Sequence, residues 1–246
     1  SKKGYYLTFN SSNGILQKIK KISKNGINSK IVLLKEHMFL IDNSNKLLKF
    51  NRCLVHFGVD DDQVVMTTNL KLTKFKNGED IPQAKSAEEW ERAGENKKPA
   101  WAYYNNDPST AEQCGLLYNW FAVNDPRGLA PEGWHIPSED EWKKLGDFFS
   151  QKYPRNVNSI KSKTEWTRYE NGDNTSGFNA FPCGYRSKTG SFNQFGGATA
   201  WWSASKDGGG DRSHNSMFFS FSNVYHEYNV AQNNRASGLS VRCMKD

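Results

Sequence analysis

The sequence predicts an α+β fold for most of the chain, and three observations support this prediction. Two helical patterns come first, a strand-rich and loop-rich half follows them, and no repeated strand–helix–strand unit occurs. A chain of 246 residues has room for one domain, or for a medium domain and a small one. Because 13% of the residues are aromatic and 8 of them are Trp, we expect a core built from few, large side chains.

Charge and aromatic content both change near residue 57. Residues 1–57 hold 11 of the 33 Lys+Arg and 2 of the 26 Asp+Glu, a net charge of +9, which leaves 22 basic and 24 acidic residues, or −2, for residues 58–246. None of the 8 Trp and only 3 of the 20 Gly lie before this point. We therefore predict a small basic N-terminal segment, 1–57, and a main domain, 58–246.

The N-terminal segment is predicted to be β-rich. Short apolar runs at 5–9, 31–34, 38–41 and 47–50 are separated by turn clusters. The Lys-rich stretch 18–24 is interpreted as a solvated edge or face, because charged edges prevent sheets from pairing with one another. The alternative is that this stretch docks onto an acidic partner or an anionic membrane surface.

Two helices are expected in the main domain. The stretch 111–123 places its large apolar residues at helical spacing, and a Pro/Gly-containing loop ends it. Ser138 and Glu141 form a capping-box pattern, which marks the start of the second helix. The buried stripe of that helix is expected to be Trp142, Leu145, Phe148 and Phe149.

Strands and turns are expected beyond residue 175. The candidate strands are 177–185, 191–195, 200–204, 216–221, 227–231 and 239–243. In the fourth, Met217, Phe219 and Phe221 recur at every second position, which is typical of a half-buried strand. The connecting loops are long and rich in Asn, Gly and Ser, and such loops commonly carry binding sites.

Eight short motifs in collinear order resemble the Fibrobacter succinogenes major paralogous domain. They include QVVMTTNL at 63–70, GLLYNW at 115–120, GWHIPS at 133–138, WWS at 201–203 and SVRC at 240–243. The family is similar to C-type-lectin-like proteins and is related to the formylglycine-generating-enzyme fold, so the resemblance implies a C-type-lectin-like fold. Its members are typically surface-exposed or lipid-anchored proteins of Bacteroidetes-like bacteria, which implies a secreted or outer-membrane surface location.

The four cysteines, Cys53, Cys114, Cys183 and Cys243, are far apart and contain no C-x-x-C motif, so one or two disulfides remain open. The chain departs from the family pattern, with Ala130 where Cys is common and Cys183 where Gly is usual. The resemblance then leaves Cys183 with Cys243 as the disulfide candidate. Related formylglycine-generating enzymes hold copper with two cysteines near the C-terminus, whereas this chain offers only Cys243 there, so we expect no enzyme activity.

No other catalytic or metal motif is present, and no cofactor is expected. The five histidines lack metal-ligand spacing, and His135 is interpreted as a structural residue before a helix cap. Two acidic turns, formed by Asp60, Asp61 and Asp62 and by residues 171–174, suit either Asx hydrogen bonding or a structural Ca²⁺ ion.

The candidate binding site is the stretch 201–235. Aromatic, Arg and Asn side chains in loops are typical of ligand-binding surfaces, and a sugar ring stacks on an aromatic face while its hydroxyls meet Asn and Asp. The expected ligand-binding residues are Trp202, Asp211, Arg212, Asn215, Tyr225, His226, Tyr228, Asn229, Asn233 and Arg235. At least one of Trp201 and Trp202 is expected in the core.

We therefore expect a secreted or cell-surface module that binds glycan or protein through its C-terminal loop face. One alternative is a non-catalytic accessory subunit of a bacterial envelope complex that docks through the basic segment, and another is a variable binding protein diversified by a retroelement. No nucleic-acid partner is expected. Charged residues break the most apolar run, so membrane association is expected only through a lipid anchor or docking. The start at Ser1 is interpreted as that of a mature protein without its signal peptide.

Overall fold

The chain forms two compact units, Ser1–Cys53 and Leu54–Asp246, in the computed structural model. The structure describes residues 63–154, 156–167, 171–206, 215–222 and 228–246, together with the backbones of six strands between Tyr5 and Phe57. The predicted boundary lies after residue 57, whereas the two units divide before Leu54. The reason is that β6 (Leu54–Phe57) pairs antiparallel with β7 (Gln63–Met66) inside the second unit.

The first unit contains only strands among its described residues. β1 (Tyr5–Phe9) and β2 (Leu16–Lys21) form an antiparallel pair. β3 (Lys30–Leu34), β4 (His37–Ile41) and β5 (Leu47–Asn51) form a three-stranded antiparallel sheet. Four of these strands coincide with the four apolar runs, and β2 contains the first half of the Lys-rich stretch.

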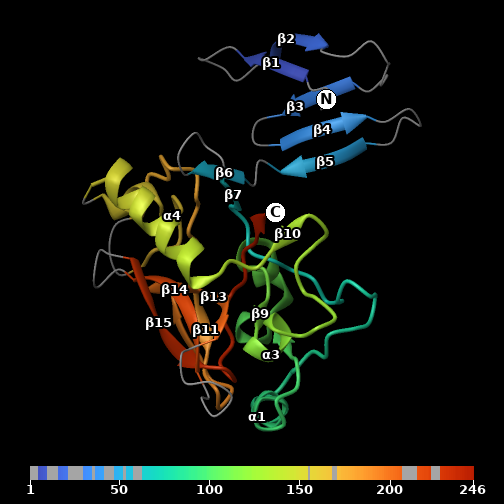
Figure 1. Ribbon diagram of the computed structural model, residues 1–246, viewed down its shortest axis with the longest axis vertical. Helices are drawn as coiled ribbons and strands as arrows, with labels where there is room; N and C mark the ends of the chain where they lie inside the picture. The colour runs from blue at the N-terminus through green and yellow to red at the C-terminus, as the bar shows by residue number, and fades with distance from the viewer. Residues whose placement is uncertain are drawn as a thin grey trace. The chain divides into compact units, whose positions relative to one another are not determined.

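The second unit is a mixed α+β structure, as predicted. Its main sheet has the order β12-β11-β13-β14-β15, formed by Phe192–Phe195, Cys183–Arg186, Ala198–Lys206, Asn215–Ser222 and Tyr228–Asn234. All neighbours are antiparallel except β11 and β13. A smaller sheet joins β10 (Trp134–His135), β16 (Met244–Lys245), β7 and β6. The helix α4 (Glu139–Lys152) packs against β13, β14 and β15 (Figure 1).

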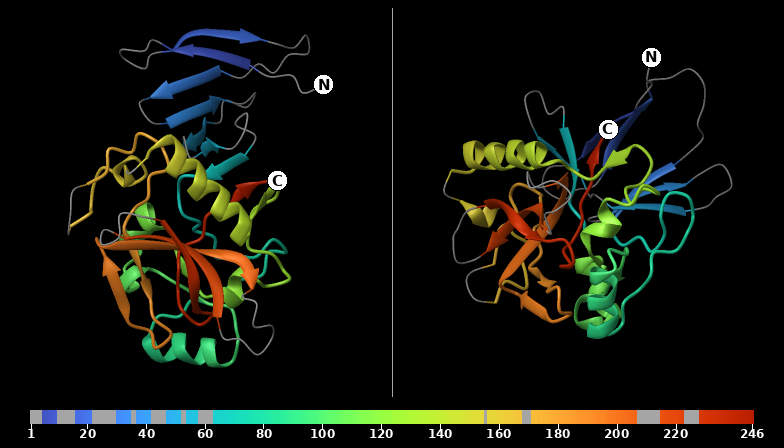
Figure 2. Two further views of the ribbon diagram at one scale, coloured as in Figure 1. Left: turned by 60° about the vertical axis from the view of Figure 1, so that its left-hand side comes forward. Right: turned by 60° about the horizontal axis from the view of Figure 1, so that its bottom comes forward.

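α4 begins as the capping box predicted. The Ser138 hydroxyl accepts a hydrogen bond from the Glu141 amide, and the Glu141 carboxylate accepts one from the Ser138 amide. Trp142, Leu145 and Phe149 are buried, and Phe148 packs partly buried beside them. A further helix, α1 (Ala87–Glu95), was not predicted, and it lies at the opposite end of the unit from α4 (Figure 2).

The predicted continuous helix over 111–123 is wrong. The described chain instead forms α2 (Ala111–Cys114), then β9 (Leu117–Tyr118), which pairs with β8 (Trp101–Ala102), and then α3 (Trp120–Val123). Gly115 ends α2 with a φ of +65°, and a Cβ there would lie 2.5 Å from the Leu70 carbonyl oxygen. Of the apolar residues that suggested a helix, Leu116, Leu117 and Trp120 are buried, whereas Phe121 is only partly buried.

Short 3₁₀ helices connect these elements at Tyr104–Asn106, Pro108–Thr110 and Val157–Ser159. Five of the six predicted strands overlap β11 to β15. The sixth, 239–243, is wrong, because its residues form only isolated bridges, from Leu239 to Tyr118 and from Ser240 to Trp201.

Trp201 and Trp202 bury the two faces of β13. Successive side chains of a strand point to opposite faces. Trp201 therefore packs with Trp142, Phe178 and Phe219, while Trp202 lies in a second cluster with Tyr118. Both are fully buried, and the Trp202 indole donates to the Tyr118 carbonyl at 2.8 Å. The prediction that Trp202 contacts ligand is wrong, because both faces of this central strand are covered.

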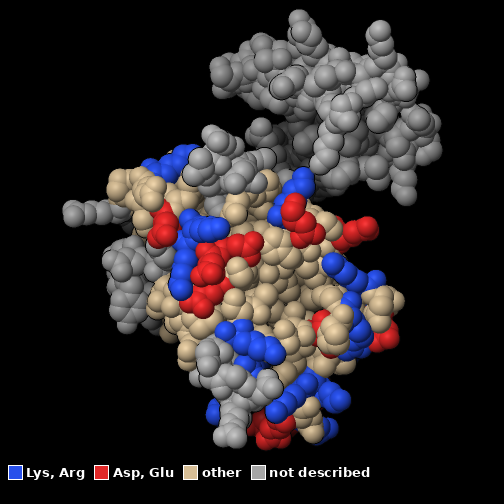
Figure 3. Space-filling view, viewed as in Figure 1, with Lys and Arg blue, Asp and Glu red and all other residues tan. Residues whose placement is uncertain are grey.

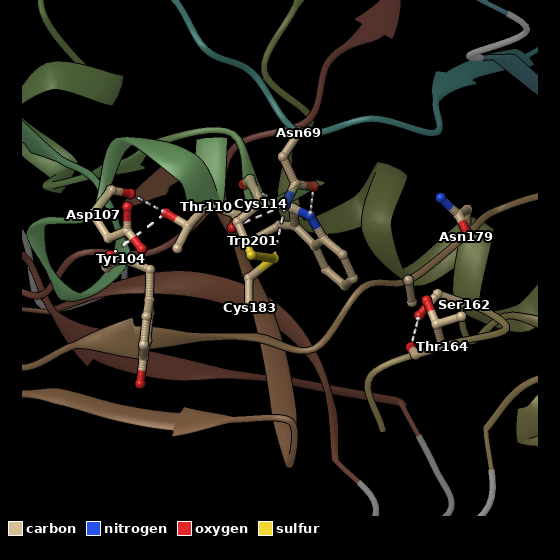
Figure 4. Close-up of a disulfide and its surroundings, with 12 residues drawn as sticks. Asn69, Tyr104, Asp107, Thr110, Cys114, Ser162, Thr164, Asn179, Cys183 and Trp201 are labelled. Carbon is tan, nitrogen blue, oxygen red and sulfur yellow. Dashed lines mark hydrogen bonds between the residues drawn. A yellow bond between two sulfur atoms is a disulfide. The ribbon is translucent and has the colours of Figure 1, made fainter. Parts of the chain in front are cut away.

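The buried amide of Asn69 joins four segments of the second unit, and Figure 4 shows it beside Trp201 and Cys114. Its oxygen accepts from the Trp201 indole and from Arg242 Nε, each at 2.8 Å. Its nitrogen donates to the Cys114 carbonyl at 2.9 Å and to the Ser240 hydroxyl at 3.1 Å. All of the hydrogen-bonding capacity of one side-chain amide is used.

Arg242 is buried beside Asn69. Its guanidinium lies between the rings of Phe178 and Trp201, 4.4 and 4.8 Å from their centroids. It donates to the carbonyls of Phe178 and Asn179 at 2.6 and 2.9 Å. These contacts attach the C-terminal stretch to the loop that precedes β11.

The disulfide joins Cys114 to Cys183 (Figure 4), with Cα atoms 5.4 Å apart. Cys243 is a buried free thiol. The predicted pairing of Cys183 with Cys243 is therefore wrong. The end of α2 at Gly115 brings Cys114 to β11, whereas Cys243 lies in the hydrophobic cluster that contains Trp202. Cys53 lies outside the described residues.

Replacing Asn69 by Ala is expected to lower the free energy of unfolding by about 3 kcal/mol, because the Trp201 indole and the Arg242 guanidinium lose a buried acceptor. Urea denaturation followed by circular dichroism measures this. Asn77→Ala is the matched control, since Asn77 is exposed and only accepts from the Glu79 amide. A loss below about 1 kcal/mol for Asn69→Ala would contradict the role given to this amide.

Candidate functional site

A cleft of about 380 Å³ opens between α1, α3 and the end of β15. α1 and the residue that follows its C-cap contribute Glu91, Glu95 and Lys97. α3 contributes Phe121, and the β11–β12 loop contributes Lys188. The end of β15 and the turn after it complete the wall with Asn234, Arg235 and Ala236. This volume lies within the range of small-molecule sites, roughly 300–1,000 Å³.

α1 is fixed directly to the end of β15. The Trp90 indole donates to the Ala236 carbonyl at 2.9 Å. A Cβ at Gly94 would lie 2.5 Å from the Ala236 Cβ, so only Gly allows this approach. The base of the cleft is therefore closely packed.

Arg186 holds the beginning of α1 and the loop that carries Lys188. Its buried guanidinium lies 4.7 Å from the centroid of the Trp90 ring and donates to the carbonyls of Ala84, Ser86 and Gly190. Burial lowers the pKa of Arg186 to about 10, and the negative charge of Glu89 opposes this shift. The guanidinium stays charged at neutral pH and joins the segment before α1 to the β11–β12 loop.

Arg235 is oriented before any ligand arrives. Its guanidinium lies 4.7 Å from the centroid of the Trp120 ring, and its Nε donates to the Ser216 hydroxyl at 3.0 Å. Its own carbonyl accepts from the Trp120 amide at 2.9 Å. A side chain held in this way loses little conformational entropy when it binds.

The cleft carries three cations, Lys97, Lys188 and Arg235, against two carboxylates, Glu91 and Glu95, a net charge of +1. Elsewhere on the second unit, basic and acidic side chains are interspersed on the face that Figure 3 shows. The apolar ring of Phe121 lies among these charges. Such a lining suits a ligand that offers hydroxyl groups, one face able to pack on a ring, and a carboxylate.

The structure brings only part of the predicted site together. Arg235 lies in the cleft, whereas the Asn233 side-chain oxygen accepts from the Asn234 amide and the Ser237 hydroxyl and so stabilises the turn. Asn229 is exposed, but it lies six positions before Arg235 along β15, about 20 Å at a rise of about 3.3 Å per position.

Asp211, Arg212, Tyr225 and His226 lie outside the described residues. Asn215 and Tyr228 are described by backbone alone. Asn215 pairs with Asn234, which places its backbone beside the cleft, and Tyr228 pairs with Phe221 at the far end of β15.

Asn234 lies within the predicted stretch 201–235 but was not named as a ligand-binding residue. Seven cleft residues lie outside that stretch: Glu91, Gly94, Glu95, Lys97, Phe121, Lys188 and Ala236. α1 was missed because it buries little besides Trp90 and so lacks an apolar stripe. The sequence nevertheless contains a start signal, Ser86 followed three residues later by Glu89, and the Ser86 hydroxyl accepts from the Glu89 amide at 3.2 Å.

No group of three His, Cys, Asp or Glu side chains able to hold a metal occurs within the described part of the chain. The turn 171–174 is stabilised by Asx hydrogen bonds, in which Asp173 accepts from the Thr175 amide and Asn171 from the Trp166 amide. The acidic turn of Asp60, Asp61 and Asp62 lies outside the described residues.

His135 links the start of α4 to the C-terminal strand. Its Nε2 lies 2.8 Å from Glu141 and its Nδ1 lies 2.8 Å from Asp246. Burial lowers the pKa of His135, but the two hydrogen bonds and the charges of Glu141 and Asp246 raise it above the usual value. Burial raises the pKa of Glu141, but hydrogen bonds from Ser138 and His135 lower it overall. The predicted structural role of His135 agrees with these contacts.

A family model described as the Fibrobacter succinogenes major domain matches residues 61–245, which is more than half of the chain. No curated protein and no solved structure matches the chain.

Replacing His135 by Gln is expected to lower the free energy of unfolding. The loss should be largest at pH values above the lowered pKa of Glu141, which is below 4.5, and below the ordinary His pKa of 6.5. His135 is charged there in both folded and unfolded chains, and its pairs exist only in the folded chain. The difference in unfolding free energy between the variant and the wild type shrinks as pH rises through the raised pKa of His135. It should not exceed about 1 kcal/mol, because water screens these partly exposed pairs.

Urea denaturation at about pH 5.5 and about pH 9 measures this difference. Lys143→Gln, which removes the exposed pair with Glu139, is the control and should show the same difference at both pH values. A His135→Gln difference that grows with pH would contradict the assignment.

Proposed function

The chain belongs to the Fibrobacter succinogenes major domain family, and on this premise we propose that Leu54–Asp246 is a non-catalytic, C-type-lectin-like module that binds a glycan. The mixed α+β architecture, with few helices and a strand-rich sheet, supports the fold part of this proposal. The cleft between α1 and β15 supports the binding part, and the glycan unit in it is one that carries a carboxylate.

The observation that carries the proposal is the fixed guanidinium of Arg235 in a cleft that also holds Phe121. A cleft of about 380 Å³ accommodates a small saccharide. Arg235 and Lys188 provide donors for a sugar carboxylate, and Glu91 and Glu95 provide acceptors for hydroxyl groups. The Phe121 ring offers a surface for the C–H face of a pyranose.

The cysteines support the non-catalytic part of the proposal. Burial raises the pKa of Cys243 to about 12, so its thiolate is scarce at neutral pH. Cys114 and Cys183 are joined in a disulfide. The copper-binding pair of cysteines found in formylglycine-generating enzymes therefore has no counterpart among the described residues.

A secreted or surface location is part of the proposal. The Cys114–Cys183 disulfide supports it, because disulfides persist mainly in oxidising compartments. In the part of the chain that the structure describes, no helix has the length and apolar character needed to cross a bilayer.

Binding of the full chain to an array of acidic and neutral glycans tests the cleft. Lys188→Glu and Phe121→Ala are each expected to weaken binding of carboxylate-bearing glycans about tenfold, because each removes one contact worth about 1.4 kcal/mol. Lys144→Glu, a reversal of an exposed lysine on α4, should leave binding unchanged. Binding that survives both cleft substitutions in folded protein would overturn this site.

A second candidate function is docking of a non-catalytic accessory subunit within an envelope complex. The observation that favours it is charge segregation: Ser1–Cys53 contains 11 basic and 2 acidic residues, so the +9 coincides with one compact unit. A single-sign surface attracts acidic partners and raises association rates.

The triple variant Lys18→Glu, Lys20→Glu and Lys21→Glu on β2 tests this docking. It is expected to abolish co-sedimentation of the full chain with its envelope fraction, and the wild-type interaction should weaken as salt rises. Lys71→Glu, Lys85→Glu and Lys144→Glu on the second unit provide a matched control. Equal loss in both triple variants would contradict a role specific to the basic unit.

A further inference from the structure

Three aromatic side chains gather at the β12 edge of the main sheet. The Tyr104 ring lies against Phe192 and Phe195, with centroids 5.2 and 5.0 Å apart. Figure 4 shows the Tyr104 ring extending alongside the strands, with its hydroxyl directed away from the disulfide. Phe195 is 40% exposed, and Leu72, at 36%, is the other exposed large apolar side chain within the described ranges. We call Tyr104, Phe192 and Phe195 the aromatic platform.

A strained backbone creates the platform. Phe192 and Phe195 are three positions apart, so in a regular strand they would point to opposite faces. Gln194 between them has a φ of +62°, which breaks the alternation and brings both rings to Tyr104. Opposite them, Gly184 has a φ of +58°, and a Cβ there would collide with the Asn193 carbonyl oxygen.

Amide-bearing residues are neighbours of the platform in the sequence. Asn105 and Asn106 directly follow Tyr104, and both are exposed with left-handed φ values of +52° and +56°. Gln194 is exposed as well. Asn tolerates a left-handed φ, whereas Gln rarely adopts one, so the backbone strain lies at Gln194, and such strain concentrates where a protein holds a ligand.

Internal packing accounts for only part of this arrangement. Phe192 covers the buried guanidinium of Arg186, 4.6 Å from the ring centroid. This contact explains Phe192 but gives no reason for the exposure of Phe195. The charged neighbour Asp107 accepts from the Ser109 amide at 2.9 Å and from its hydroxyl at 2.7 Å. The platform itself is uncharged.

We propose that the aromatic platform is a second ligand site, which holds a neutral oligosaccharide. The C–H face of a pyranose packs on the exposed ring of Phe195 and on the half-buried Tyr104 ring beside it, and its hydroxyls exchange hydrogen bonds with Asn105, Asn106 and Gln194. An uncharged ligand fits because these six residues carry no charge, whereas five charged side chains line the cleft. None of the platform residues lines the cleft, so the two sites are tested separately.

Isothermal titration of the full chain with cellohexaose, xylohexaose, laminarihexaose and mannohexaose tests the proposal. At least one of these neutral hexasaccharides is expected to bind, and Phe195→Ala should weaken that binding about tenfold. Leu72→Ala is the matched control, because it removes the other exposed apolar side chain and should leave the affinity unchanged.

Two further variants separate ring contact from other effects. Tyr104→Phe keeps the ring and should retain binding, whereas Tyr104→Ala should lose it. Lys188→Glu in the cleft should leave neutral-sugar binding unchanged, so failure of the cleft proposal remains distinguishable.

The proposal is overturned if no neutral hexasaccharide binds at millimolar concentration, or if folded Phe195→Ala binds like wild type. It is also overturned if sedimentation shows a dimer that Phe195→Ala dissociates, because the platform would then contact a second copy of the chain.

Discussion

The buried amide of Asn69 is the interaction on which the second unit depends. It accepts from Trp201 and Arg242 and donates toward Cys114 and Ser240, so it joins a loop, a disulfide-bonded helix, the central strand and the C-terminal stretch. Buried polar groups must be paired, and here one side chain pairs several of them together. The junction holds Trp201 of β13 in one of the two largest buried clusters, while the neighbouring Trp202 lies in the other.

Arginine stacked on aromatic rings is the second recurring device. Arg242 lies between Phe178 and Trp201, Arg186 contacts Trp90 and Phe192, and Arg235 contacts Trp120. Each of these stacks attaches a loop or a helix to the interior of the unit. Arg186 contacts one residue at each proposed site. Trp90 lies beneath the cleft, and Phe192 belongs to the aromatic platform. The two sites therefore share one support without sharing a ligand-contacting residue.

The sequence predicted best where a local signal decides the structure. The capping box at Ser138 and Glu141 fixes the start of α4, and the alternation around Phe219 fixes β14. The predictions failed where contacts between residues distant in the sequence determine the structure. Gly115 breaks an apparently continuous helix because the Leu70 backbone approaches it, and the same break brings Cys114 to Cys183. Trp202 was predicted to contact ligand because local patterns do not specify the order of strands in a sheet. That order is what covers both faces of β13.

The guanidinium groups of the interior are bound by oxygens that hold no titratable proton. Arg186 donates to the carbonyls of Ala84, Ser86 and Gly190, and Arg242 donates to two further carbonyls and to the Asn69 amide. A buried ion pair with a carboxylate breaks when acid neutralises that carboxylate. These bonds persist under acid, so acidification would loosen the His135 and Glu141 contacts at the surface while the interior keeps its cohesion.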